Sequence, residues 1–141
     1  MMEEISFLGP SDLETLTNVA PDVFDQPVRK DLAREFLEDP RHHLAAATHD
    51  GRIVGFASAV HYLHPDKEPE LWINEVGVAP DHRGRGIGER LLRAMLHHGR
   101  QLGCREAWVL AERDNEPAMR LYGSVGGIRS PGDPVMFSFD L

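Results

Sequence analysis

Apolar residues recur along this chain at two spacings, and turn residues separate the segments in which each spacing holds. Segments that are apolar throughout or at every second position are typical of strands, and an apolar residue at every third or fourth position is typical of helices. The pattern predicts strands at residues 5–8, 44–48, 53–62, 71–78, 106–111 and 135–140, and helices at residues 11–20, 28–38, 87–102 and 116–125. This order predicts a single α/β domain over residues 1–141, with helices flanking a central mixed sheet.

Turn and cap residues sharpen three of these predictions. Asp50-Gly51 between two apolar runs predicts a β-hairpin. Ser11, followed three residues later by Glu14, predicts a capping box at the start of the first helix. Gly77 lies inside the predicted strand 71–78, where a glycine indicates either a β-bulge or the close approach of a ligand.

The charge and composition of the chain limit the classes of partner. Its 141 residues carry a formal net charge of −8 at pH 7. Because phosphate backbones select basic surfaces, we expect no nucleic-acid partner, whereas an acidic surface would attract a cationic substrate. No apolar run is long enough to span a bilayer, so we expect no membrane partner. The single cysteine, Cys104, excludes an internal disulfide and fits a reducing, cytoplasmic location.

The histidines of the chain raise the question of a metal site, since there are 8 of them. The sequence has no H-E-x-x-H motif. The neighbouring pairs His42-His43 and His97-His98 would point in divergent directions on any regular element. We therefore predict no metal site from the sequence.

The strand at residues 71–78 leads through a Pro-Asp turn into a glycine-rich loop that opens the longest predicted helix. The first turn of a helix has backbone N–H groups without partners and the positive end of the peptide dipole. Glycines let a phosphate approach the backbone, and Arg83 and Arg85 can add charge-assisted hydrogen bonds. This stretch therefore predicts an anion site for a ligand that carries phosphate.

The spacing of the glycines distinguishes this loop from other phosphate-binding loops. No Lys-Ser/Thr pair of a Walker loop follows it, and its G-x-G-x-G pattern differs from the G-x-G-x-x-G dinucleotide fingerprint. Arg83-x-x-Gly86-x-Gly88, directly behind an apolar strand, resembles the acetyl-CoA pyrophosphate loop of the GCN5-related N-acetyltransferase family. The order of predicted strands and helices is also that of the family, so the resemblance covers essentially the whole chain.

The resemblance implies acetyl-CoA as co-substrate and a cofactor site in three parts. Backbone groups of Val76, Gly77 and Val78 would bind the pantetheine arm. Asn115 and Ala118 match a second cofactor element, in which an asparagine precedes a helix that carries a tyrosine near the thioester sulfur. The pyrophosphate would be held by Arg83, Gly84, Arg85, Gly86, Ile87 and Gly88.

Glu75 and Tyr122 are the candidate catalytic residues. Glu75 is the only acid between residues 71 and 79, where family members often carry the carboxylate that deprotonates the amine, commonly through water. It could instead only pair with an arginine or a neighbouring strand, because an ionisable group in an apolar strand is costly unless it is used or paired. Tyr122 shares a helix face with Ala118, and its phenol can protonate the departing thiolate, although it could also be a core tyrosine.

A second, narrower resemblance concerns the acceptor. Four short motifs resemble those of the type I aminoglycoside 3-N-acetyltransferases: Leu8-Gly9-Pro10, residues 73–76, residues 117–122 and residues 135–140. This implies acetylation of the 3-amino group of an aminoglycoside antibiotic by direct attack on the thioester, and thus antibiotic resistance.

Other readings stay open. The acceptor could be another amine, such as a polyamine, an amino acid, or the N-terminus or a lysine of a protein, and the chain could be a non-catalytic acyl-CoA sensor. Because the family often forms dimers, we expect a homodimer. The acids best placed to line a pocket for a cationic substrate are Asp25, Glu112, Asp114, Asp133 and Asp140.

Overall fold

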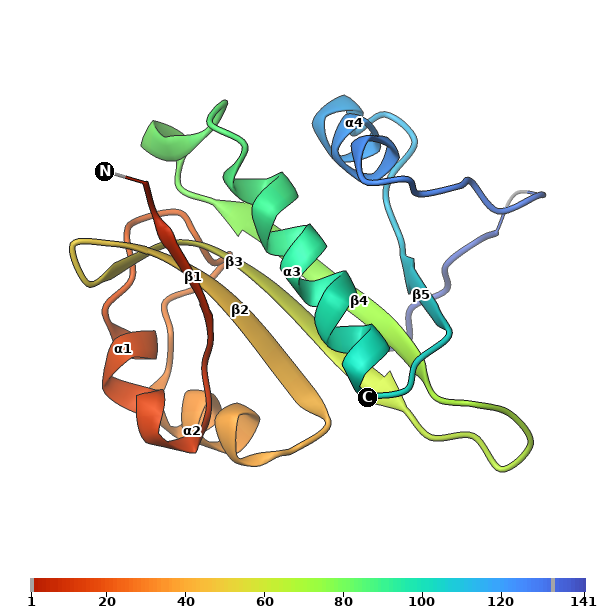
Figure 1. The fold of residues 1–141 in the computed structure, drawn as a ribbon, viewed down its shortest axis with the longest axis horizontal. Helices are drawn as coiled ribbons and strands as arrows, with labels where there is room; N and C mark the ends of the chain where they lie inside the picture. Colours follow the sequence, from red (N-terminus) through yellow and green to blue (C-terminus); the bar gives the residue numbers. More distant parts are fainter. Residues whose placement is uncertain (1, 133) are drawn as a thin grey trace.

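The computed structural model describes residues 2–132 and 134–141, which form a sheet covered by helices (Figure 1). The sheet has 5 strands in the order β1-β2-β3-β4-β5. Strands β1 to β4 pair antiparallel, and β5 runs parallel to β4. The strands are β1 (Glu4–Phe7), β2 (His42–His49), β3 (Arg52–Tyr62), β4 (Glu70–Val78) and β5 (Glu106–Val109). The helices are η1 (Pro10–Asp12), α1 (Leu13–Thr17), α2 (Lys30–Glu38), η2 (Pro80–His82), α3 (Ile87–Gln101) and α4 (Glu116–Ser124).

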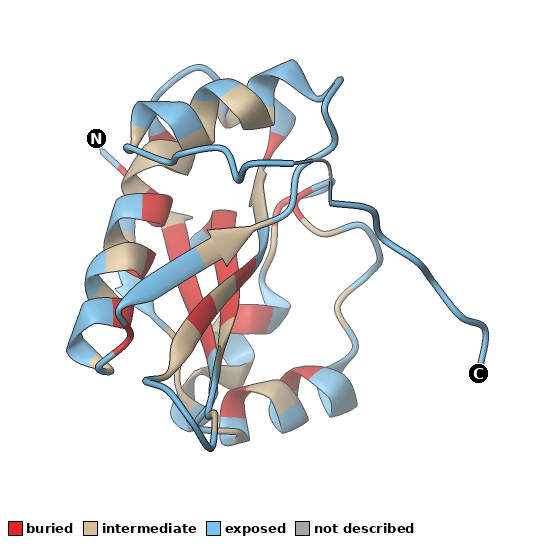
Figure 2. Ribbon diagram, turned by 90° about the vertical axis from the view of Figure 1, so that its right-hand side faces the viewer, coloured by how far each residue is buried: buried red, intermediate tan, exposed pale blue. Residues whose placement is uncertain are grey.

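The two faces of the sheet are covered by different parts of the chain. A Cβ atom on Gly55 would lie 3.2 Å from the side chains of Ile87 and Leu91, so this side of β3 faces α3. The next residue, Phe56, points to the opposite face and stacks on Phe24 with ring centroids 4.1 Å apart. Because both faces are covered, β2 and β3 are buried along most of their length, as the red strands in Figure 2 show.

Helix α3 begins and ends where the sequence predicts. Gly86 precedes it in the left-handed conformation with φ of 78°, and Gly103 follows it with φ of 87°. Its apolar stripe, buried against the sheet, consists of Ile87, Leu91, Leu92 and Met95. Among the described residues, no helix combines the length and hydrophobicity that crossing a membrane requires.

The β-bulge lies three residues before the position that we expected. Ser58 pairs with Glu75 and the adjacent Ala59 pairs with Ile73, which leaves Asn74 as the extra residue of β4. Gly77 is regularly paired, and glycine is required there for a different reason. A Cβ atom at Gly77 would lie 2.6 Å from the carbonyl oxygen of Val23. The chain itself therefore makes the close approach.

The bulge coincides with the end of the pairing between β4 and β5. That pairing runs from Glu70 opposite Glu106 to Ile73 opposite Val109. Beyond Ile73 the two strands separate, and residues 74–78 of β4 keep β3 as their paired neighbour among the described residues. Their other edge therefore presents backbone N–H and C=O groups that the sheet does not use.

Two local predictions were wrong. The reciprocal contact at the first turn joins Gly9 and Asp12, with the Gly9 N–H donating to an Asp12 carboxylate oxygen at 2.7 Å, while Glu14 pairs with Lys30. Residues 135–140 form no strand, and Figure 2 shows the C-terminal segment running clear of the sheet. Its apolar alternation has no sheet edge beside it, so Phe137 and Phe139 remain 79% and 82% exposed.

Three histidines from separate elements form a hydrogen-bonded chain beneath α3. His43 of β2 has Nε2 2.8 Å from Nδ1 of His61 and Nδ1 3.0 Å from Nε2 of His98. Burial, together with the nearby His98 and His61, lowers the pKa of His43 from 6.5 to about 4. Burial also lowers the pKa of His98.

The pKa of His43 predicts acid sensitivity of the fold. The unfolded chain takes up this proton near pH 6.5, while the folded chain resists it down to about pH 4. The free energy of unfolding should therefore fall as the pH decreases from about 6.5, by up to about 2 kcal/mol between pH 7 and pH 5. Urea unfolding at the two pH values measures this. His43→Gln should flatten the dependence and the exposed-site control His97→Gln should keep it; an unchanged slope in His43→Gln would assign the effect to other groups.

Candidate active site

The glycine-rich loop joins the end of β4 to the start of α3. Gly84 and Gly86 adopt the left-handed conformation, with φ of 77° and 78°, which residues with a side chain rarely adopt. The Nε of Arg83 donates to the backbone carbonyl of Val78 at 3.1 Å and so ties the loop to the end of the strand. These constraints fix the direction in which α3 leaves the loop.

The first turn of α3 has backbone N–H groups that no side chain of the described residues caps. Gly86, the N-cap, offers no side-chain acceptor, so no side chain caps the N–H groups of the first turn. Gly88 leaves room over this turn, because a Cβ atom there would make only ordinary contact with Leu121, at 3.5 Å. The nearest acid on the helix, Glu89, is held by Arg93 at 2.8 Å. Residues 83–88 therefore form a turn that ends in uncapped backbone N–H groups at the start of α3.

The second arginine of the loop has an acidic neighbour. Arg85 lies 3.7 Å from the buried carboxylate of Glu3, and Arg90 lies 3.5 Å from its other oxygen. A hydrogen bond from its own backbone, together with both arginines, lowers the pKa of the Glu3 carboxyl despite its burial. The carboxylate of Glu3 thus partly compensates the positive charge that Arg85 brings to the loop.

The predicted second cofactor element also forms. The side-chain oxygen of Asn115 accepts a hydrogen bond from the backbone N–H of Ala118 at 3.2 Å and caps α4, which confirms the predicted N-cap. This cap orients the helix that carries Tyr122. Burial raises the pKa of the Tyr122 phenol, which stays protonated at neutral pH.

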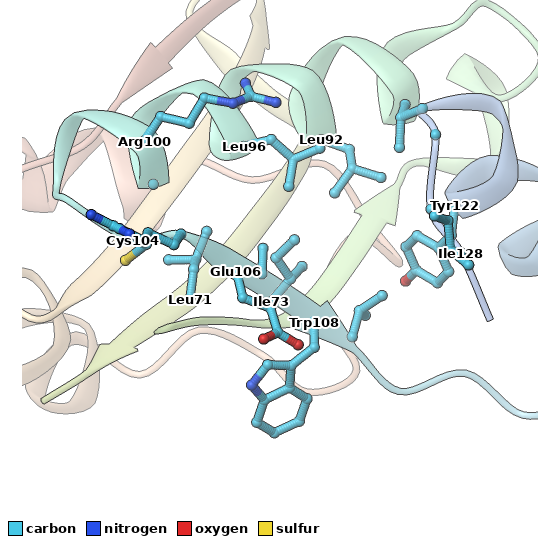
Figure 3. Close-up of a pocket in the computed structure, with 17 residues that line it drawn as sticks. Leu71, Ile73, Leu92, Leu96, Arg100, Cys104, Glu106, Trp108, Tyr122 and Ile128 are labelled. Atoms are coloured by element: carbon cyan, nitrogen blue, oxygen red, sulfur yellow. The ribbon is translucent and has the colours of Figure 1, made fainter. Parts of the chain in front are cut away.

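Tyr122 lines a cavity of about 480 Å³ between α3, α4 and the ends of β4 and β5 (Figure 3). Leu71, Ile73 and Leu92 contribute to its wall, which makes it largely apolar. Glu75 is not among the residues that line it. The two candidate catalytic residues therefore lie on different sides of the sheet.

The pairing of β3 and β4 explains the position of Glu75. Adjacent residues of a strand point to opposite faces of the sheet, so the side chains of Ser58 and Ala59 lie on opposite faces. Paired residues share a face, so Glu75 lies on the face of Ser58 and Ile73 lies on the face of Ala59. Glu75 thus faces away from α3, toward the side covered by the segment before α2. The surrounding protein raises the pKa of its carboxyl, and the negative charge of Asp25 raises it further, although the side chain stays accessible to solvent.

An aromatic row shares this face with Glu75, and no short stretch of the sequence indicates it. Trp72 and Trp108 stack with ring centroids 5.2 Å apart, and Tyr62 stacks on Trp72 at 6.1 Å. Trp72 pairs with Val60 and with Trp108, which places the row on the Ser58 side of the sheet. The row became visible only with the pairing, because its members come from three strands.

Of the acids that we predicted to line a pocket for a cationic substrate, only some lie near Glu75. Asp25 is close enough to Glu75 to shift its pKa. Glu112 and Asp114 lie in the connection between β5 and α4, where their backbone carbonyls accept hydrogen bonds from Asn115 and Glu116. Asp140 lies on the exposed C-terminal segment, and Asp133 lies outside the described residues.

Comparison with known proteins agrees with this geometry. Residues 11–126 match the pattern of the family described as "Acetyltransferase (GNAT) family". A mycothiol acetyltransferase of Saccharomonospora viridis is 35% identical over 73% of this chain and 35% of its own length. A second, of Thermomonospora curvata, is 39% identical over 67% of this chain and 30% of its own length. The chain thus spans about a third of the length of these relatives.

Solved structures with the same fold include aminoglycoside acetyltransferases. The enzyme meta-AAC0020, from an uncultured soil metagenomic sample, superposes with a TM-score of 0.84 at 20% identity and covers 99% of this chain and 97% of its own. A complex of meta-AAC0020 with sisomicin superposes with the same TM-score of 0.84. The aminoglycoside N-acetyltransferase AAC(6')-Iy in complex with CoA has a TM-score of 0.77 at 22% identity and covers 98% of this chain and 94% of its own.

The electrostatic coupling of Glu75 to Asp25 can be tested directly. Asp25→Asn removes a negative charge, so the raised pKa of Glu75 should move back toward its usual value. Titration of the side-chain carboxyl carbons by NMR measures the change. Asp22→Asn, three residues away in the wall of a different cavity, is the matched control and should leave the pKa of Glu75 unchanged. An equal effect of both variants would contradict a specific pair.

Proposed function

The chain belongs to the acetyltransferase (GNAT) family, and from this premise we propose that it transfers an acetyl group from acetyl-CoA to a primary amine, with the 3-amino group of an aminoglycoside as the preferred acceptor. The observation that carries the proposal is the loop at residues 83–88, whose left-handed glycines and uncapped helix start form an anion site beside the unpaired edge of β4. Acetyl-CoA has both a pyrophosphate for the anion site and an amide-bearing arm for the edge of β4.

The separation of β4 from β5 gives the arm a path into the sheet. In this proposal the pyrophosphate accepts hydrogen bonds from the first turn of α3 and from Arg83 and Arg85. The arm pairs with backbone groups of Val76, Gly77 and Val78, as a further strand would. The thioester then reaches the opening beyond Ile73, where both faces of the sheet are accessible.

This position reconciles the two catalytic residues. An aliphatic amine is mostly protonated at neutral pH, since its pKa lies near ~10, and it must lose a proton before it can attack. Glu75, whose raised pKa makes it a stronger base, accepts that proton from one face of the sheet, directly or through water. Tyr122, still protonated, donates its proton to the departing thiolate from the other face.

The acceptor site would lie beside Glu75 on the face that carries the aromatic row. Carboxylates attract the ammonium groups of a polycation, and flat aromatic surfaces support sugar rings and cations. The two carboxylates, Glu75 and Asp25, meet the first requirement. Neighbours of the same fold that bind sisomicin or carry the name of aminoglycoside acetyltransferases support this choice.

A second candidate acceptor rests on sequence rather than fold. The curated relatives that are 35% and 39% identical are mycothiol acetyltransferases, so the acceptor of those enzymes is the main alternative. A non-catalytic acyl-CoA sensor would have no need of a carboxyl and a phenol with raised pKa values at the opening.

The test is a panel of amines assayed for thiol release from acetyl-CoA. The panel contains gentamicin, sisomicin, spermidine, single amino acids, a peptide with a free N-terminus and the acceptor of the mycothiol acetyltransferases. The proposal expects the aminoglycosides to give the highest kcat/KM, with acetylation at the 3-amino group by NMR of the product. Turnover of another amine alone would refute the assignment of an aminoglycoside acceptor and leave the acetyltransferase assignment intact. No turnover of any amine would refute both assignments.

A charge placed at the start of α3 should block the cofactor without unfolding the protein. A Cβ atom at Gly88 would make only ordinary contacts, and an acid is favourable at a helix N-terminus, but the carboxylate of Gly88→Glu would repel the pyrophosphate. In thermal unfolding, acetyl-CoA at 100 times its Kd should stabilise the native chain by about 2.7 kcal/mol. This stabilisation should vanish in Gly88→Glu and persist in Gln101→Glu, which adds the same charge at the other end of α3. Equal stabilisation of both variants would refute the loop assignment.

Removal of the Tyr122 hydroxyl should slow turnover and leave cofactor binding intact. Tyr122→Phe keeps the ring in its cavity and loses only the proton donor, so kcat should fall by about two orders of magnitude. The KM for acetyl-CoA should change little. Tyr62→Phe, the same change at the other tyrosine of the chain, is the control and should keep most of kcat. Near-native kcat in Tyr122→Phe would show that solvent protonates the thiolate.

A further inference from the structure

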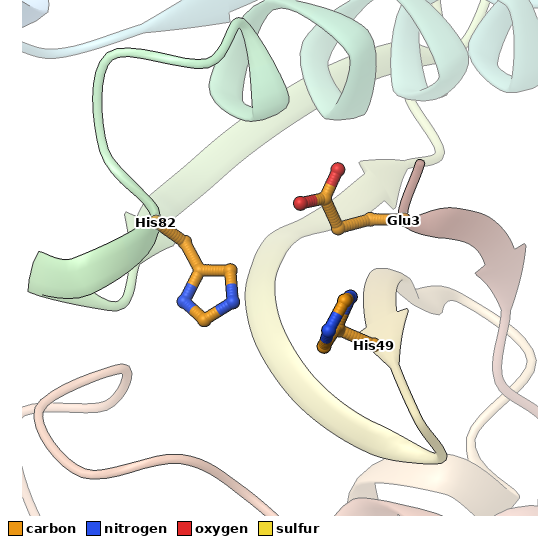
Figure 4. Close-up of side chains that lie close together, drawn as sticks. All are labelled: Glu3, His49 and His82. Carbon is orange, nitrogen blue, oxygen red and sulfur yellow. The ribbon is translucent and has the colours of Figure 1, made fainter. Parts of the chain in front are cut away.

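Three metal-ligating side chains meet on the side of the molecule away from the Tyr122 cavity. They are Glu3, just before β1, His49 at the end of β2 and His82 at the end of η2. One ligand atom from each lies within 4.8 Å of the others. Figure 4 shows the two imidazole rings side by side, with the carboxylate of Glu3 above His49.

We propose that Glu3, His49 and His82 bind a divalent transition-metal ion of the Zn²⁺ class. Two imidazole nitrogens and one carboxylate oxygen are a ligand set that Zn²⁺, Ni²⁺ and Co²⁺ accept. Residues 3, 49 and 82 are far apart in the sequence and form no metal-binding motif. The prediction of no metal site rested on such motifs, so it does not cover ligands that only the fold brings together.

The ligand atoms need only a small closure to bind an ion. Bonds of about 2.1 Å in a tetrahedral site separate the ligand atoms by roughly 3.4 Å, so atoms now within 4.8 Å of one another must approach by at most about 1.4 Å. His49 can supply this movement, because its side chain is 36% exposed, whereas the side chain of Glu3 is only 7% exposed. The rings of His49 and His82 meet edge to face with centroids 5.7 Å apart, so a modest rotation turns two nitrogens toward one point.

One ring nitrogen of the cluster has no hydrogen-bond partner among the described residues. It is the buried Nδ1 of His82. No hydrogen bond through Nδ1 therefore fixes the tautomer of this ring, and its other nitrogen can carry the lone pair that an ion needs.

The charge around the cluster is mixed. Arg85 and Arg90 contact Glu3 and oppose a cation. On the other side, His49 and His82 border a cavity of about 450 Å³ whose wall also carries Asp22, Asp50 and Asp81. Asp50 lies 3.5 Å from Nε2 of His49. The cavity gives the ion a path from solvent, room for water as a fourth ligand and compensating negative charge.

An ion at this site would connect three segments that are distant in the sequence. Glu3 precedes the edge strand β1, His49 ends β2, and His82 stands directly before the loop at residues 83–88. The ion would therefore hold η2 against the start of the chain and stiffen the entry to the loop. Such a link adds its binding free energy to the stability of the fold.

The test is metal binding by the tag-free full chain, since an added polyhistidine would itself take up the ion. Isothermal titration with ZnCl₂ should give one ion per chain, and Co²⁺ should produce the visible absorption of a site with low coordination number. His49→Ala and His82→Ala should each weaken Zn²⁺ binding by at least about 10–100-fold. That is the order of magnitude lost when a residue that only supports a ligand is removed, and these residues are ligands themselves. Glu3→Gln keeps the size of the side chain and should weaken binding in the same way.

Two controls separate this site from the other histidines. His97→Ala removes an exposed histidine and should leave Zn²⁺ affinity and stoichiometry unchanged. His61→Ala breaks the hydrogen-bonded histidine chain beneath α3 and should also leave the Zn²⁺ affinity unchanged. Thermal unfolding without metal checks that every variant is folded. The proposal is overturned by absence of one-to-one binding at millimolar ZnCl₂, by native affinity in folded His49→Ala and His82→Ala, or by loss of the ion in His61→Ala.

Discussion

The extra residue at Asn74 is the constraint on which the rest of the site depends. It interrupts β4 at the point where pairing with β5 ends, after Ile73 and Val109. The sheet therefore opens between two strands instead of continuing across them, and one edge of β4 keeps unused backbone groups. Because the loop at residues 83–88 follows this edge directly along the chain, the proposed anion site is continuous with the opening. A long ligand with a phosphate group at one end can use both.

The opening also decides how two groups on different faces can act together. Glu75 faces the side of Asp25 and the aromatic row, and Tyr122 faces the cavity beneath α3. In a closed sheet the layer of backbone would separate them. In the proposed mechanism, a thioester placed where the strands part would be reached from both sides, with the cationic acceptor on one face and the leaving group beside the Tyr122 cavity on the other.

Local signals predicted the elements that local interactions determine. The Asp50-Gly51 hairpin, the glycine at the start of α3 and the Asn115 cap were all visible in short stretches, and the structure confirms them. Features that arise from pairing of distant segments were missed or misplaced. The bulge at Asn74 depends on the register with β3. Residues 135–140 have the alternation of a strand, yet alternation without an adjacent edge produces no pairing. The clusters of histidines needed the fold to bring them together.

Backbone amide hydrogen exchange with and without acetyl-CoA tests the central claim most directly, since it reports on the edge of β4 itself. Acetyl-CoA should slow exchange at two places: residues 76–78, where the arm would pair with the edge, and residues 87–89, where the pyrophosphate would meet the first turn of α3. Exchange in the β2–β3 hairpin should not change. Slower exchange confined to residues 106–109 and 122–128 around the Tyr122 cavity, with none at 76–78, would contradict the account.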